Sequence, residues 1–330
     1  MYTSAYTLLR MCRRARAAYV RRMPQATPAT PMAAGTTITE TVLDAVRGNA
    51  ARRAGAALID PARELGYAAF AEEVAAAADG LRRHGARPGD VGAVHVSGVC
   101  DLAVAVHAVS ASGAVPALLP PDAAPAEAAA LLTESGARFL LAGADTAART
   151  LAAAERSYVR QVFAFGDVPG TTPFARLLEP GPGTGDPPAP DPLRDPALRL
   201  CAPPEEITHA DRLADLYRLG GALGLGRGDV LVLSGRDVTA PTWIGLTDLC
   251  LTQGVTAVGV PGAGTRALLD AILDHGATAA VVTPAKLRAI AFDHGRIPVT
   301  GVRLLVTGTP PAEAARACRD RYAWTVSPLC

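Results

Sequence analysis

Lysine is almost absent from this sequence: Lys286 is the only one, although lysine and arginine together number 32 among 330 residues. Aromatic residues make up 5% of the chain, and the six cysteines form no Cys-x-x-Cys pair or Cys/His cluster at metal-ligand spacing. The sequence therefore predicts reduced thiols, a cytoplasmic location and no metal site of the usual zinc type. It also predicts no membrane span, because no apolar run is long enough.

Charge of either sign is sparse as well. Charged residues make up 19% of the chain, and the formal net charge is +1. Arginines and acidic residues are interspersed, so no broad field exists that would attract nucleic acid or an anionic membrane. A role with a small molecule fits this composition better.

Residues 1–35 differ from the rest, because they carry arginines and no acidic residue before a Pro/Ala/Thr-rich stretch. This pattern is superficially like a transit peptide, but no long apolar segment follows. We expect a disordered tail, or a stretch upstream of the true start codon, for which Met23 and Met32 are candidates. A targeting or membrane-surface role is the alternative.

From Thr36 onward, amphipathic helical stretches alternate with short apolar runs, which predicts an α/β fold of βαβ units around largely parallel sheets flanked by helices. The clearest helix is 67–84, with Phe70, Val74, Ala77 and Leu81 on one face. Further helices are expected at 101–112, 125–135, 208–223, 242–251, 266–274 and 286–293, and strands at 91–96, 114–119, 138–141, 230–233, 256–260, 278–282, 302–306 and 323–327.

Two related halves are expected. Residues 181–197 are rich in Pro and Gly and predict a linker between a first α/β subdomain, 36–180, and a second, 198–330. A weak repeat supports this division, because 85–91 and 224–230 both join a helix to a strand through Gly-Asp-Val. Asp90 and Asp229 in these segments are expected to be turn residues.

The same segments resemble the N-terminal part of adenylate-forming enzymes, the acyl-CoA synthetases and aryl-CoA ligases. The similar segments occur in the family's order at 57–59, 66–67, 81–91, 112–116, 134–138, 207–209, 223–230, 254–258 and 306–311. The resemblance implies the two N-terminal subdomains of that family. It also implies an ancestral chemistry in which ATP and Mg²⁺ activate a carboxylate as an acyl-adenylate, usually for transfer to coenzyme A.

The family's phosphate-binding loop is expected to be lost. In the family, a Ser/Thr/Gly-rich loop ending in Pro-Lys-Gly precedes a Thr-His pair. Here 200–207 precedes Thr208-His209 and contains no Gly, Ser, Thr or Lys. Two prolines remove backbone donors, and Glu205 and Glu206 place negative charge where phosphate would bind.

Other motifs of the resemblance depart as well. In the family, the segment that corresponds to 235–243 holds an aromatic residue and a histidine beside the acyl pocket. Here it contains Trp243 but no histidine. Trp243 is expected either to be a core residue, which is favoured, or to form the floor of an acyl pocket. A turn against adenine corresponds to Gly308, Thr309, Pro310 and Pro311, expected to be vestigial. The chain stops at Cys330, before the family's Gly-Tyr-Gly-x-Thr-Glu motif and C-terminal domain.

The remaining signals have ordinary explanations. Lys286 is expected on a surface helix and matches neither functional lysine of the family. The segment 259–266 is expected to be a strand-to-helix turn rather than a phosphate loop, because it lacks the lysine. His95, central in an apolar strand, is expected to be a satisfied core residue rather than a catalyst.

The sequence therefore predicts a degenerate, truncated ligase-like protein with no catalytic residue, no metal site and no tightly bound cofactor. Its expected partners are an acyl or aryl carboxylate, a true ligase, a carrier protein or a second copy of itself. The rival hypothesis is an active ligase with unconventional ATP contacts or with a C-terminal domain supplied in trans. A gene remnant without function is the third possibility.

Overall fold

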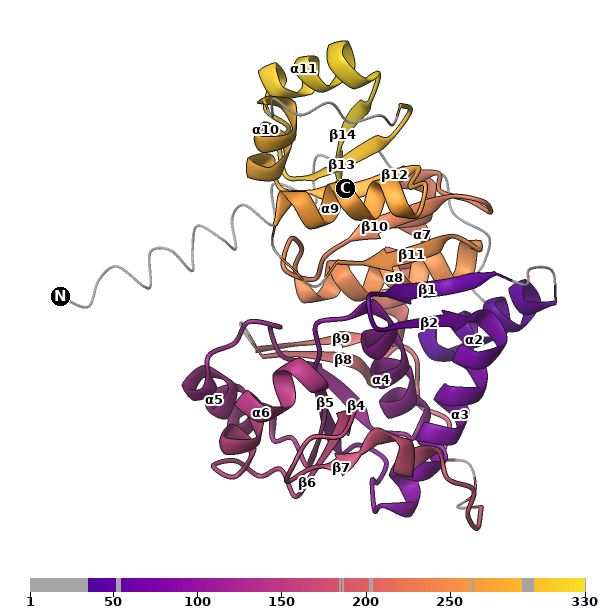
Figure 1. Cartoon of the computed structure of the whole chain (residues 1–330). Coiled ribbons are helices and arrows are strands. Elements are labelled where there is room, and N and C mark those ends of the chain that lie inside the picture. Colours follow the sequence, from indigo (N-terminus) through magenta and orange to yellow (C-terminus); the bar gives the residue numbers. More distant parts are fainter. Residues whose placement is uncertain are drawn as a thin grey trace, which may run out of the picture. The chain divides into compact units, whose positions relative to one another are not determined.

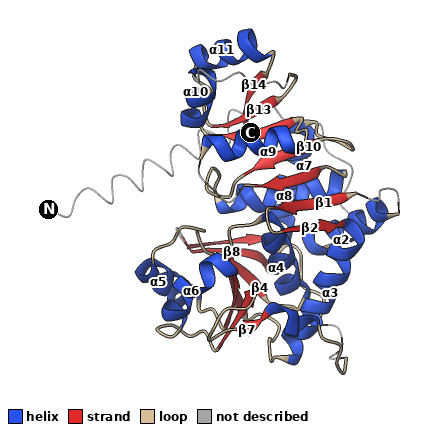
Figure 2. Ribbon diagram, in the orientation of Figure 1, coloured by secondary structure: helices blue, strands red, loops and turns tan. Residues whose placement is uncertain are grey.

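The computed structural model describes residues 35–51, 55–183, 185, 187–201, 204–260, 262, 264–292 and 300–329 (Figure 1). The tail prediction for residues 1–35 lies almost wholly outside this range. Within it, helices and strands alternate and the strands form two seven-stranded sheets, which confirms the α/β class with largely parallel sheets (Figure 2).

The first half of the chain contains most of one sheet and its helices. Its elements are α2 (Ile38–Ala50), β1 (Ala56–Asp60), β2 (Arg63–Gly66), α3 (Tyr67–Arg83), β3 (Val91–His95), α4 (Val99–Ala111), β4 (Val115–Leu118), α5 (Pro125–Ser135), β5 (Phe139–Gly143), α6 (Ala144–Ala154), β6 (Gln161–Phe165), β7 (Thr172–Pro173) and the 3₁₀ helix η1 (Phe174–Leu178).

The second half repeats this order. Its elements are β8 (Pro196–Cys201), β9 (Pro204–Thr208), α7 (His209–Leu223), β10 (Val230–Leu233), α8 (Ala240–Gln253), β11 (Thr256–Gly259), α9 (Thr265–Asp274), β12 (Ala279–Val282), α10 (Pro284–Phe292), β13 (Arg303–Thr307), α11 (Ala312–Tyr322) and β14 (Thr325–Leu329).

The internal repeat extends to individual hydrogen bonds. The carboxylate of Asp90 accepts the Arg87 N–H at 3.0 Å, and the carboxylate of Asp229 accepts the Gly226 N–H at 2.8 Å. The backbone oxygen of each aspartate then accepts from the next parallel strand, at Val115 and Thr256 respectively. Both aspartates are turn residues, as the sequence predicts.

The two halves exchange hairpins. The first sheet has the order β7-β6-β5-β3-β4-β8-β9, and the second has β14-β13-β12-β10-β11-β1-β2. Thus the β1–β2 hairpin, from the start of the chain, pairs with β11 of the second half, while β8–β9 pairs with β4 of the first half. Sheet membership therefore crosses the subdomain boundary predicted at residues 197 and 198. The described residues of the expected linker before β8, 181–183, 185 and 187–195, contain no helix or strand.

Buried helices join the sheets. α4 contacts β3 and β4 of the first sheet and also β1 and β11 of the second. Ten of its thirteen residues are buried, and a helix that is apolar on all sides must be enclosed by its neighbours. α8 packs beside it and buries Trp243, Ile244 and Leu246, so a single core continues from one sheet to the other.

Candidate functional site

The carboxyl edge of the first sheet is where a ligand site is expected. From β3 the chain moves to β4 on one side and then to β5 on the other, so the strand order reverses at β3. Ligands of open parallel sheets bind outside the carboxyl ends of strands at such a reversal. Two cavities lie along this edge.

The Trp243 cavity, of about 470 Å³, lies between the ends of β3 and β4 and the loop that leads into α8. Val94, Val96 and Leu118 form an apolar wall, and Trp243 closes it from α8. The Trp243 side chain is 4% exposed and also belongs to the core, so the two roles considered for it are compatible. A ligand contact by Trp243 stays a prediction.

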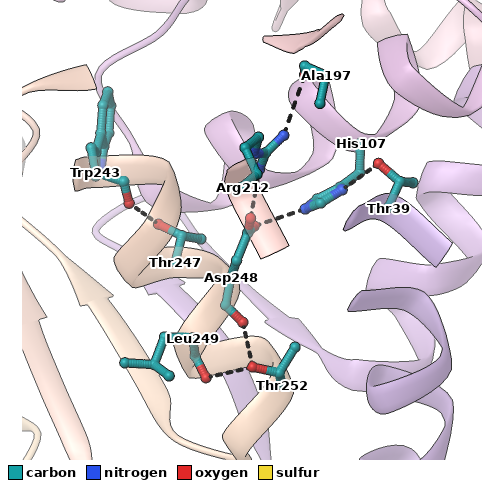
Figure 3. A network of polar contacts seen from close by, with 9 residues as sticks. All are labelled: Thr39, His107, Ala197, Arg212, Trp243, Thr247, Asp248, Leu249 and Thr252. Carbon is teal, nitrogen blue, oxygen red and sulfur yellow. Dashed lines mark hydrogen bonds and ion pairs between the residues drawn. The ribbon is translucent and has the colours of Figure 1, made fainter. Parts of the chain in front are cut away.

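Gly235 fixes the position of the Trp243 ring. A Cβ atom at Gly235 would lie 2.7 Å from the indole ring, which is closer than carbon atoms can approach. The carbonyl of Trp243 accepts the Thr247 hydroxyl at 2.9 Å (Figure 3). Charged groups on the cavity lining are Arg236 and Asp122.

At the position of the expected phosphate loop, the structure has a tight hairpin. β8 and β9 pair antiparallel, and their last pair is Cys201 with Pro204. Only two residues separate this pair in the sequence, and both lie outside the described range. Glu206 is exposed and forms an ion pair with Arg199. Thr208 caps α7 by accepting the Asp211 N–H at 3.1 Å.

Two histidines at the ends of first-sheet strands are buried: His95 ends β3 at the carboxyl edge, and His209 follows β9 at the opposite edge. The pKa of His209 is lowered to about 4, first by burial and then by Arg212. His95 bonds Thr150 at 2.5 Å through Nδ1, and burial lowers its pKa to about 4. Nε2 of His95 has no hydrogen-bond partner among the described residues, so the expected core histidine is only half satisfied. Both rings are neutral at pH 7.

The expected adenine-side turn lies on the other sheet. Gly308, Thr309, Pro310 and Pro311 connect β13 to α11, and Gly308 has a φ of +95°. Gly308 and Thr309 are exposed, and none of the four residues lines the Trp243 cavity. Nucleotide binding by this turn stays a prediction.

The expectation for Lys286 is wrong. Its ammonium group donates to Asp237 at 2.6 Å, and the two side chains are 8% and 5% exposed. The sequence pattern placed Lys286 on a surface helix, but Lys286 is one of the buried residues of α10, with Leu287, Ile290 and Ala291. The lone lysine is therefore held in a buried ion pair rather than facing solvent.

A buried polar network that the sequence did not reveal joins four helices (Figure 3). Asp248 of α8 accepts from His107 of α4 at 3.0 Å and from Arg212 of α7 at 2.5 Å. The other ring nitrogen of His107 bonds Thr39 of α2 at 3.1 Å. Burial alone would raise the pKa of Asp248, but Arg212 and His107 hold it below its ordinary value. These residues come from separate segments, and no local motif links them.

The second cavity, which we name the switch-point cavity, has a volume of about 530 Å³ and lies at the ends of β3, β5 and β6. Arg63 pairs there with Glu73 at 2.7 Å and with Asp101 at 3.3 Å. Burial, followed by neighbouring carboxylates, raises the pKa of Asp101 to about 7 despite Arg63. No local motif in the sequence indicates this cluster.

Within the part of the chain that the structure describes, no group of three or more His, Cys, Asp or Glu residues is arranged to hold a metal ion. Over the same residues, no helix combines the length and the apolar character needed to cross a membrane.

The interlocked, largely parallel sheets flanked by helices define a doubly wound α/β protein. Residues 46–200 match the family of AMP-binding enzymes. Over 283 residues the chain is 30% identical to the salicyl-AMP ligase / salicyl-S-ArCP synthetase of Mycobacterium tuberculosis, an alignment covering 79% of this chain and 49% of that protein. The chain belongs to the adenylate-forming superfamily and spans about half the length of this curated relative.

Solved structures show the same fold. The benzoate CoA ligase of Burkholderia xenovorans LB400 superposes with a TM-score of 0.75 at 20% identity, over 88% of this chain and 60% of that one. Mycobacterium smegmatis MbtA superposes with a TM-score of 0.71 at 25% identity, over 89% of this chain and 58% of that one.

Proposed function

We propose that this chain is a degenerate member of the adenylate-forming superfamily that binds an acyl or aryl carboxylate in the Trp243 cavity without activating it. The observation that carries the proposal is the tight β8–β9 hairpin. Only two residues separate the paired Cys201 and Pro204, where the family has a longer loop that wraps phosphates.

Electrostatics at this hairpin also disfavour ATP. Catalysis of adenylation depends on preorganised donors and cations that stabilise charge on the phosphates. Pro204 offers no N–H, and the exposed Glu205 and Glu206 follow it. Loss of one such donor typically costs about 10²–10³ in rate, so loss of several makes turnover undetectable. ATP, Mg²⁺ and coenzyme A are therefore cofactors of the ancestral reaction that this chain does not bind tightly.

The Trp243 cavity suits a small carboxylate. Its volume of about 470 Å³ lies within the usual range of about 300–1,000 Å³ for ligand pockets. The wall is apolar, and the lining holds one guanidinium group, that of Arg236, which can donate to a carboxylate, together with the carboxylate of Asp122. The relatives named for salicyl-AMP and benzoate support an aryl acid as the first ligand to test.

The macromolecular partners in this proposal are a catalytically competent ligase, a carrier protein or a second copy of the chain. The proposal places the protein in the cytoplasm. In support, Cys100, Cys201, Cys250 and Cys318 are free and buried.

The test combines two measurements on the full chain. Isothermal titration with benzoate and salicylate should show binding that Arg236→Gln weakens and that the matched exposed variant Arg227→Gln leaves unchanged. ATP–pyrophosphate exchange with the same acids should equal a heat-killed control, and Mg²⁺-ATP should give no thermal shift. Exchange by the lone chain would overturn the proposal. Exchange only after addition of a relative's C-terminal domain would favour an enzyme completed in trans.

A further inference from the structure

The switch-point cavity has the position and the composition of a ligand site. It opens between the ends of β3 and β5, where the strand order of the first sheet reverses, which is the usual place for a ligand in such sheets. Ala144, Asp145 and Ala175 on its lining are exposed, so solvent reaches it. The site is separate from the Trp243 cavity: no residue lines both.

One side of the cavity is aromatic. Phe165, at the end of β6, stacks on Phe174 of η1 with ring centroids 4.1 Å apart. Leu178 continues this apolar surface. An aromatic pair of this kind binds a flat apolar group and attracts a cation held over its face.

The opposite side carries surplus negative charge. The carboxylates on the lining are those of Asp60, Glu73, Asp101 and Asp145, and Arg63 is the one cationic side chain among the lining residues. The N-termini of α4 and α6 also face this edge, and each counts as about half a positive charge. After both helices and Arg63 are counted, between one and two negative charges remain uncompensated near neutral pH, because Asp101, with a pKa of about 7, is only partly ionised there.

Two of these carboxylates are held in place by the fold. Asp60, the last residue of β1, accepts the N–H groups of Val99 and Cys100 at 3.0 and 2.7 Å and so caps α4. Asp145, in the first turn of α6, accepts the Ser97 hydroxyl at 2.8 Å across the strand reversal. The acidic side of the cavity is thus fixed before any ligand arrives.

The second half of the chain has an ion pair at the equivalent place. In the second sheet the strand order reverses at β10, as it does at β3 in the first sheet. The loop after β10 meets the first turn of α10 there, just as the loop after β3 meets the first turn of α6 in the first half. The contact is the buried pair between Asp237 and the ammonium group of Lys286, 2.6 Å long. In the first half the equivalent contact is between Ser97 and Asp145, with no lysine. The first half therefore has a cavity lined by several carboxylates at the place where the second half has the Asp237–Lys286 ion pair.

We propose that the switch-point cavity binds an organic monocation, an amine that carries an aromatic or branched apolar group. Its ammonium group lies among Asp101, Glu73 and Asp145, in the role that the Lys286 side chain has in the second half. Its apolar group lies against Phe165 and Phe174. The raised pKa of Asp101 agrees with this assignment: burial raises it first, and Asp60, Glu73 and Asp145 raise it further against the opposing Arg63.

The experiment uses the full chain and phenethylammonium as the probe, titrated calorimetrically at pH 7.5 and low salt. Two analogues of the same shape serve as controls: 2-phenylethanol, which is neutral, and phenylacetate, which is an anion. We expect phenethylammonium to bind at least tenfold more tightly than either analogue. Equal affinity for the three compounds, or no binding of the amine at millimolar concentration, overturns the proposal.

Variants locate the site. Asp145→Asn removes one charge at an exposed position and should weaken amine binding at least fivefold, whereas the matched exposed variant Asp215→Asn on α7 should not. Ala175→Trp, also exposed, should block the entrance without disturbing the core. Because both positions are exposed, the variants should keep the parent melting temperature. Amine binding unaffected by both variants places the amine elsewhere and sinks the proposal.

Discussion

The carboxylate of Asp248 lies 2.5 Å from the guanidinium of Arg212, and the two side chains are 2% and 6% exposed. Arg212 reaches from α7 to the carbonyl of Ala197 on β8 as well, at 3.4 Å. Through Arg212, the pair therefore links α8 of the second half to the β8–β9 hairpin, which belongs to the first sheet. Its removal should affect how the two halves hold together.

Asp248→Asn should lower the free energy of unfolding by about 3–5 kcal/mol, because it leaves the Arg212 charge buried without its partner. Urea unfolding followed by circular dichroism measures this. Asp215→Asn serves as the control, since its pair with Arg218 is 56% and 43% exposed and exposed pairs contribute about 0–1 kcal/mol. Equal effects of the two substitutions would show that the buried pair has no special role.

Lys286→Met should destabilise the fold by about 3–5 kcal/mol, because Asp237 would be left buried without a cation. The double variant Lys286→Met with Asp237→Leu should recover most of this loss, since a buried ion pair can be replaced by apolar groups of similar size. A double-mutant cycle in thermal unfolding provides the measurement. A double variant no more stable than Lys286→Met alone would contradict this account of the pair.

Gly235→Ala should destabilise the protein by about 1–3 kcal/mol, because the added Cβ would lie 2.7 Å from the Trp243 ring. Gly226→Ala, at a position where a Cβ has nothing within 4 Å, is the matched control and should cost less than about 1 kcal/mol. The tryptophan fluorescence, to which Trp243 and Trp324 both contribute, should shift in the first variant only, because only that substitution contacts a tryptophan ring. An unchanged spectrum in Gly235→Ala would argue against the packing described.

Stability should fall as the pH rises through the titration of Asp101. Its folded-state pKa is raised from 3.8 to about 7, by burial and by Asp60, Glu73 and Asp145, with Arg63 opposing. The folded state therefore holds the proton more tightly than the unfolded chain, so the stabilisation is complete below pH 3.8 and is lost by about pH 7.

Urea titrations at pH 4.5 and pH 8 check this prediction. The change in the free energy of unfolding between these two pH values should differ by about 1–2 kcal/mol between the parent and Asp101→Asn. This figure is discounted because the side chains are partly exposed to solvent. Asp215→Asn should retain the parent's pH dependence. Parallel profiles for the parent and Asp101→Asn would mean that Asp101 does not titrate in this range.

The sequence predicted the parts of the fold that depend on local pattern. Helix 67–84 is predictable because Phe70, Val74, Ala77 and Leu81 repeat at helical spacing. Thr208 and Asp211 have the spacing of a capping box, and the structure shows that box at the start of α7. The two Gly-Asp-Val turns revealed the repeat. Each of these signals lies within a few neighbouring residues.

What the sequence did not predict depends on contacts between distant segments. Lys286 was misplaced because nothing in α10 itself indicates that Asp237, 49 residues earlier, faces it. The Asp248 network likewise joins His107 to a carboxylate 141 residues away. The switch-point carboxylates come from β1, α3, α4 and α6, so only the folded chain brings them together.

The hairpin exchange has a consequence for synthesis on the ribosome. The β1–β2 hairpin emerges long before its strand partner β11: the Thr256 hydroxyl that bonds the carbonyl of Ala56 is made 200 residues later. At about 5–20 residues per second, this hairpin waits for roughly 10–40 s without its strand partner. During that time β1 presents an unpaired edge that can associate with other chains. The nascent protein is therefore most vulnerable to aggregation before β11 emerges, and a chaperone that shields this early hairpin should raise the yield of folded protein more than one acting after release.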